Sequence, residues 1–137
     1  MNIVLDVSAA FGMLLRKSAG AEICDIVRQA DVVLAPDLYV SEMTNVAWKY
    51  QKAGVLSVDE AGRLLTLGID FVDEFVPGSD LAQEALFEAR RLGHPAYDLF
   101  YIVVARRNLA TLVTLDHRLA EVGRSLGLAT RADRGTG

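Results

Sequence analysis

The sequence predicts an α/β fold in which helices cover both faces of a parallel sheet. Short apolar segments that suit strands alternate along the chain with longer segments that suit helices. The chain has 137 residues, of which 52% are hydrophobic and 23% charged, as expected for one globular domain. A domain of this size buries enough surface to fold without disulfides. Its single cysteine, Cys24, excludes an intrachain disulfide framework and a Cys-rich zinc site.

The N-terminal half of the chain predicts two strands and four helices. Ser8 suits the N-cap of the first helix, and Pro36 closes the second strand. The third helix carries apolar and aromatic side chains at helical spacing. Ser57 and Glu60 form a capping box that opens the fourth helix. We expect strands at 2–6 and 32–35 and helices at 8–16, 21–30, 38–52 and 57–67.

The C-terminal half predicts three more strands and three more helices. Pro77 stops the first of these strands, and Gly93 and Gly127 suit helix C-termini. Pro95 suits a first helical turn, where its missing N–H has no cost. We expect strands at 71–76, 111–115 and 128–130 and helices at 81–92, 95–108 and 116–126. The domain then covers residues 1–130, and we expect 131–137 to be a flexible tail.

Two of the predicted strands end in an aspartate. Asp6 follows the apolar segment Ile-Val-Leu, and Asp116 follows Leu-Val-Thr-Leu. The carboxyl ends of parallel strands lie at one edge of a sheet, where ligands bind in open α/β folds. We therefore expect the two side chains to lie at that edge. The alternative is that each aspartate is only the N-cap of the helix that follows.

Two further carboxylates lie on the apolar faces of predicted helices. Glu42 has Leu38 and Val46 one turn away on either side, and Asp98 lies near the start of a very apolar helix. Burying a carboxylate is costly unless it is paired or binds a metal. An ion pair with a lysine or arginine of another helix is the alternative for each.

Four carboxylates in one place would repel one another unless a cation held them together. The single cysteine and the two histidines of the chain disfavour a soft metal. Oxygen ligands suit Mg²⁺ or Mn²⁺. A partly hydrated ion of this kind activates water and stabilises negative charge on a phosphodiester. The residues thus favour metal-assisted phosphodiester hydrolysis.

Four segments of the chain carry these carboxylates in order. They are VLDVS at 4–8, PDL with SEMTNV within 36–46, AYDLFY at 96–101 followed by Ala105, and TLDHRL at 114–119. Together they resemble the PIN-domain nucleases, and among these the short VapC-type toxins of type II toxin–antitoxin systems. The resemblance implies a three-layer α/β/α sandwich with a parallel sheet of about five strands. It also implies an endoribonuclease that requires Mg²⁺ or Mn²⁺.

The resemblance further implies roles for individual residues. Asp6, Glu42, Asp98 and Asp116 would form an acidic quartet. Asp6 and Asp98 would be direct metal ligands, and Glu42 and Asp116 would bind the ion directly or through water. Ser8, Asn45 and Thr114 would orient a carboxylate or a water molecule. For these three, the alternatives are that Ser8 caps a helix, Asn45 faces solvent and Thr114 only favours its strand.

The resemblance also implies partners: an RNA substrate, a second copy of the chain in a homodimer, and a cognate antitoxin laid across the acidic groove. The net charge of −4 disfavours a non-specific binder of duplex DNA. The sequence shows neither a basic leader nor an apolar run long enough to cross a membrane, so we expect a cytoplasmic protein. Two alternatives remain, a catalytically silent PIN-like scaffold and a phospho-acceptor binding domain. The absence of lysine beyond Lys52 disfavours the second.

Overall fold

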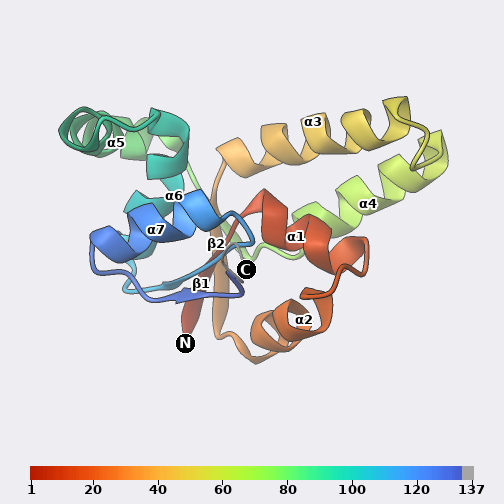
Figure 1. Ribbon diagram of the computed structural model, residues 1–137, viewed down its shortest axis with the longest axis horizontal. Helices are drawn as coiled ribbons and strands as arrows, with labels where there is room; N and C mark the ends of the chain where they lie inside the picture. The colour runs from red at the N-terminus through yellow and green to blue at the C-terminus, as the bar shows by residue number, and fades with distance from the viewer. Residues whose placement is uncertain (134–137) are drawn as a thin grey trace.

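Five parallel strands form the central sheet of the computed structural model, which describes residues 1–133 (Figure 1). Their order across the sheet is β3-β2-β1-β4-β5, so β1 lies in the middle. Ile3 pairs with Val33 of β2 on one side and with Thr111 of β4 on the other. The strands are β1 (Asn2–Leu5), β2 (Val32–Pro36), β3 (Glu74–Val76), β4 (Thr111–Val113) and β5 (Thr130–Arg131).

Seven helices cover the two faces of the sheet in the described part of the chain. Figure 1 shows α1 to α4 on one side of the strands and α5 to α7 on the other. The helices are α1 (Val7–Leu14), α2 (Gly20–Gln29), α3 (Leu38–Lys52), α4 (Val58–Asp70), α5 (Gly78–Leu92), α6 (Ala96–Arg107) and α7 (His117–Ser125). The predicted three-layer α/β/α fold with five parallel strands is therefore confirmed.

The core lies where α6 crosses the middle of the sheet. The three residues Ile3, Val4 and Leu5 of β1 have no exposed surface, and half of the residues of α6 are buried. This helix contacts β1, β2 and β4.

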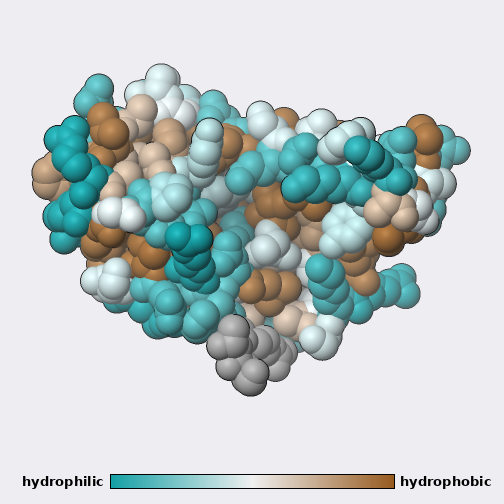
Figure 2. Space-filling view, turned by 45° about the horizontal axis from the view of Figure 1, so that its top comes forward, coloured by the Kyte–Doolittle hydropathy of each residue, from teal (hydrophilic) through white to brown (hydrophobic). Residues whose placement is uncertain are grey.

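Hydrophilic and hydrophobic residues are interleaved over the face of the molecule shown in Figure 2. Among residues 1–133, none of the helices has the length and apolar character needed to cross a membrane.

One of the helix caps expected from the sequence is present, and another is wrong. The capping box of Ser57 and Glu60 is present at the start of α4. The N-cap of α1 is Asp6 rather than Ser8, because the Asp6 carboxylate accepts a hydrogen bond from the N–H of Ala9 at 2.9 Å. The hydroxyl of Ser8 instead donates to Asp6.

The other differences concern strands. The segment predicted as a strand at 71–76 contributes only Glu74–Val76, because α4 continues to Asp70. The sheet also extends past the boundary expected at residue 130. Arg131 belongs to β5, and Ala132 is buried, so these residues do not form the start of a free tail. The rest of the expected tail, 134–137, lies outside the described residues.

Candidate active site

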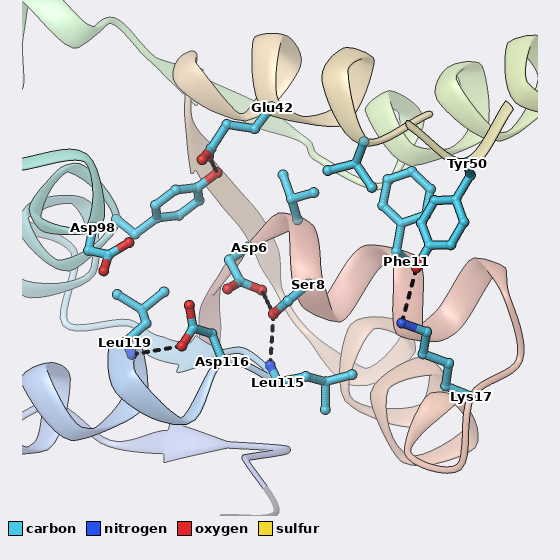
Figure 3. A pocket seen from close by; sticks show the side chains of 13 residues that line it. Asp6, Ser8, Phe11, Lys17, Glu42, Tyr50, Asp98, Leu115, Asp116 and Leu119 are labelled. Atoms are coloured by element: carbon cyan, nitrogen blue, oxygen red, sulfur yellow. Dashed lines mark hydrogen bonds between the residues drawn. The ribbon is translucent and has the colours of Figure 1, made fainter. Parts of the chain in front are cut away.

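The four carboxylates that the sequence singles out line one pocket of about 450 Å³ (Figure 3). Asp6 follows β1 directly, and Asp116 is the N-cap of α7 shortly after β4. Because β1 and β4 are neighbours and parallel, both side chains lie at the carboxyl edge of the sheet. Glu42 reaches the pocket from α3, and Asp98 from the first turn of α6. The spatial convergence expected from the sequence is therefore present.

Asp6 is the most enclosed of the four carboxylates, with 5% of its surface exposed. One oxygen accepts hydrogen bonds from the Ser8 hydroxyl at 2.7 Å and the Ala9 N–H at 2.9 Å, and the other accepts one from the Thr114 hydroxyl at 2.5 Å. Burial raises the pKa of Asp6 to about 6, although these three hydrogen bonds act in the opposite direction. The negative charge of Asp116 adds to the increase in this pKa.

Ser8 and Thr114 connect the ends of β1 and β4 through their hydroxyl groups. The Ser8 oxygen accepts from the N–H of Leu115 at 2.9 Å, and the Thr114 oxygen accepts from the N–H of Asp116 at 2.9 Å. Each hydroxyl therefore has a backbone donor that orients its own proton toward Asp6. This network holds the Asp6 carboxylate in one orientation at the base of the pocket.

Glu42 is held by Tyr101, a residue of α6 that the sequence pattern does not indicate as part of the site. The buried Tyr101 hydroxyl donates to a carboxylate oxygen of Glu42 at 2.6 Å. Burial raises the pKa of Glu42, the hydrogen bond from Tyr101 lowers it, and the nearby charge of Asp98 raises it further. Burial also raises the pKa of the Tyr101 hydroxyl, so this group remains a donor.

Asp98 contacts His94, which lies just before α6. The Nε2 atom of His94 is 2.7 Å from a carboxylate oxygen of Asp98, and 9% of the histidine side chain is exposed. The sequence signal for this contact is the spacing of four residues across the start of a helix. Arg106 and Arg107 do not reach Asp98, because both pair with Glu84, at 2.7 and 3.2 Å.

Two other pocket predictions have different outcomes. Asn45 is exposed and does not line the pocket, so its placement agrees with the alternative in which it faces solvent. Lys17 also lines the pocket, although nothing in the sequence around it indicates a functional role. No local pattern could have identified Lys17, because it lies in the turn after α1 and approaches the pocket only through the packing of α1 against α3.

The chemistry of the pocket fits a hard divalent cation. All four candidate ligands are carboxylates, and the hydroxyls beside them are oxygen donors as well. Within residues 1–133, no three His, Cys, Asp or Glu side chains are grouped closely enough to surround an ion. Their charges instead act in pairs, Asp116 on Asp6 and Asp98 on Glu42. An ion such as Mg²⁺ is usually held by one or two carboxylates and keeps several waters, so it does not require three grouped side chains.

The protein is thus a parallel α/β domain with an acidic, oxygen-lined pocket at the carboxyl edge of its sheet. Comparison with known families assigns it more closely. The PIN domain family matches residues 3–125, so the chain belongs to the PIN-domain family. Ribonuclease VapC3 of Pyrobaculum aerophilum is 29% identical over 123 residues, which cover 88% of this chain and 94% of that protein. The family predicted from the four acidic segments is confirmed.

Solved structures share the same fold. A Pyrobaculum aerophilum protein superposes with a TM-score of 0.74 at 22% identity, covering 95% of this chain and 83% of that one. VapBC2 from Rickettsia felis, solved with a DNA fragment from its promoter, gives 0.66 at 14% identity, with 96% and 98% covered. FitAcB from Neisseria gonorrhoeae gives 0.61 at 16% identity, with 93% and 95% covered.

Proposed function

We propose that the protein is a metal-dependent endoribonuclease that hydrolyses RNA phosphodiester bonds and acts as the toxin of a toxin–antitoxin pair. The observation that carries this proposal is the convergence of four carboxylates in one pocket. Within residues 1–133, none of the four forms an ion pair with a lysine or arginine, and Asp98 alone lies against a histidine, His94. The charge of the other three is therefore available to a metal ion. Membership of the PIN-domain family and similarity to ribonuclease VapC3 support the same activity.

In this proposal Asp6 and Asp98 bind Mg²⁺ or Mn²⁺ directly, and Glu42 and Asp116 bind it directly or through water. When bound, the ion supplies an activated water and offsets the charge that develops on the phosphodiester. The protein holds its carboxylates in fixed orientations. Residues that hydrogen-bond to a metal ligand in this way increase the affinity for the metal.

Four side chains provide these orientations. The hydroxyls of Ser8 and Thr114 hold Asp6, Tyr101 holds Glu42, and His94 holds Asp98. These four are positioning residues. The short, partly buried hydrogen bonds restrict these three carboxylates, so that little reorganisation is needed when substrate binds.

We further propose the partners and setting that the family resemblance implies. These are single-stranded RNA as substrate, a cognate antitoxin protein, a homodimeric assembly and a cytoplasmic location. The Rickettsia felis neighbour was solved as VapBC2, which supports a protein partner for the chain described here.

The direct test is cleavage of single-stranded RNA by the purified protein. We expect cleavage with Mg²⁺ or Mn²⁺ and none with EDTA. Asp6→Asn should reduce kcat by roughly 100-fold or more, because it removes a charge that the proposed transition state depends on. Asp25→Asn, which changes an exposed aspartate of α2 outside the pocket, is the matched control and should cleave like the parent.

Three results would contradict the proposal. One is equal cleavage with and without EDTA. Another is a folded Asp6→Asn protein that cleaves as fast as the parent. A parent protein that cuts no RNA under any metal condition would favour the catalytically silent scaffold.

A further inference from the structure

One cationic side chain lines the acidic pocket. Of the described residues around it, Lys17 is the single lysine, arginine or histidine. Figure 3 shows Lys17 beside Tyr50 and Phe11, at the opposite end of the pocket from Asp98. The pocket therefore has two chemically distinct ends, a carboxylate-rich end and an end with a lysine and a tyrosine.

The backbone of Lys17 is held on both sides by the turn between α1 and α2. Its N–H donates to the carbonyl of Gly12 at 2.9 Å, and its carbonyl accepts from the N–H of Gly20 at 2.8 Å. The turn therefore fixes the position of the Lys17 backbone, from which the side chain extends. The place of the Lys17 backbone at one end of the pocket thus follows from the hydrogen bonds of this turn.

The head of the Lys17 side chain is also directed by a contact. Its Nζ donates to the Tyr50 hydroxyl at 3.3 Å. The Tyr50 ring stacks on the buried Phe11 ring, with centroids 5.5 Å apart and an angle of 23° between the planes. Tyr50 is thereby anchored, and it provides a fixed polar point for the ammonium group.

The charge of Lys17 has no carboxylate partner among residues 1–133. Its described side-chain hydrogen bond goes to a neutral hydroxyl, and an ammonium group can donate three such bonds. The side chain is exposed, so an anionic ligand can reach it. Lys17 thus offers an available positive charge in a pocket that is otherwise negative.

We propose that Lys17, positioned by Tyr50, forms a subsite that binds a backbone phosphate of the RNA strand beside the phosphate that is cleaved. This inference rests on the proposed nuclease function. An RNA strand carries one negative charge per phosphate, and the carboxylate end of the pocket repels it. A lysine at the other end offsets this repulsion and sets the direction in which the strand crosses the pocket.

Kinetic measurements with single-stranded RNA of random sequence test the subsite. We expect Lys17→Ala to raise KM about threefold to tenfold with kcat changed less than about twofold, because the contact is made in both the ground and transition states. Lys17→Arg retains the charge and should restore most of the lost affinity. Tyr50→Phe removes the hydroxyl and preserves the ring stack, so KM should rise less than with Lys17→Ala.

Lys49→Ala is the matched control, since Lys49 is an exposed lysine of α3 that does not line the pocket. A second readout is binding of the same labelled RNA, followed by fluorescence anisotropy in the Asp6→Asn background over a series of salt concentrations. Adding Lys17→Ala should lower the slope of log affinity against log salt by about 0.7, the value for one lost contact to a single strand. Adding Lys49→Ala should leave the slope unchanged.

The outcomes separate this inference from the function on which it rests. If the parent cleaves RNA and Lys17→Ala matches Lys49→Ala in KM and salt slope, the subsite is wrong and the nuclease function stands. If the parent cleaves nothing but Lys17→Ala still weakens binding and lowers the slope, the phosphate contact of Lys17 stands, whereas the nuclease function and the place of this contact beside a cleaved phosphate fail. Absence of RNA binding by the parent overturns both.

Discussion

At the scale of single residues, burial and hydrogen bonding have opposite effects on the charge of Asp6. It caps α1, accepts two side-chain hydrogen bonds and lies beside Asp116, all with 5% of its surface exposed. Burial disfavours its charged form more than the hydrogen bonds favour it, and its pKa is raised to about 6. A protein optimised only for stability would place a neutral residue here. The charge is retained at a cost, as is common at functional sites.

This cost predicts how stability depends on pH without divalent ions. The folded-state pKa of Asp6, about 6, lies above its ordinary value of 3.8. The folded protein therefore binds this proton more tightly, so the contribution of Asp6 to the free energy of unfolding becomes less favourable as pH rises from 3.8 to 6. In EDTA at about pH 8, Asp6→Asn should be more stable than the parent by about 1 to 3 kcal/mol.

Chemical denaturation of both proteins in EDTA measures this difference. The advantage of Asp6→Asn should shrink at about pH 5, where the parent regains its proton. A constant difference between the two proteins across this range would contradict the assignment. So would a parent that is more stable than the variant at the higher pH.

At the scale of elements, α1 and the turn that joins it to α2 provide residues at both ends of the pocket. Ser8 lies in the first turn of α1, and Lys17 lies in the turn between the two helices. The two helices approach closely at Gly20, where an added Cβ would lie 2.8 Å from the backbone carbonyl oxygen of Gly12. A backbone atom cannot rotate away as a flexible side chain can, so this contact requires a glycine.

Gly20→Ala should therefore destabilise the protein by about 1 to 3 kcal/mol, the usual cost of overpacking. The control is Gly62→Ala in the exposed interior of α4, where an added Cβ meets nothing within 4 Å. That change should stabilise by about 0.5 to 1 kcal/mol, because alanine favours a helix over glycine. Urea unfolding of the two variants should give opposite signs, and equal effects would refute the close approach.

At the scale of the whole molecule, the sheet order connects distant parts of the chain to one site. β1 lies in the middle, with β4 beside it and β5 beyond. The N–H of Thr114 donates to the carbonyl of Arg131 at 3.2 Å, and the Thr114 hydroxyl in turn holds Asp6. The last described strand thus supports the first carboxylate through the strand between them.

Ending the chain at Thr130 should weaken the protein and the site together. This truncation removes the pairing of Val113 with Arg131 and the acceptor of the Thr114 N–H. We expect a loss of about 2 kcal/mol or more in the free energy of unfolding, from the lost hydrogen bonds and the loss of buried Ala132. A chain ending at Asp133 retains the described contacts and is the control. Equal urea midpoints for the two truncations would show that β5 does not contribute.

Much of the fold is predictable because its signals are local. Caps, glycines and hydrophobic periodicity placed every helix within a few residues, and the bounds of α3 agree with those predicted. The two aspartates at strand ends were predictable for the same reason, since a parallel sheet brings strand ends to one edge. The N-cap of α1 was not, because Asp6 and Ser8 are both good caps and only the tertiary contacts of Ser8 distinguish them.

The sequence by itself determined the class of fold, the family and which four carboxylates lie together in one pocket, because these depend on residue type and spacing along the chain. Only the tertiary structure decided what surrounds each carboxylate. Tyr101 meets Glu42 across 59 positions, Thr114 meets Asp6 across 108, and Lys17 reaches the pocket through helix packing. Such contacts depend on side-chain direction and on distances between elements, which local periodicity does not encode.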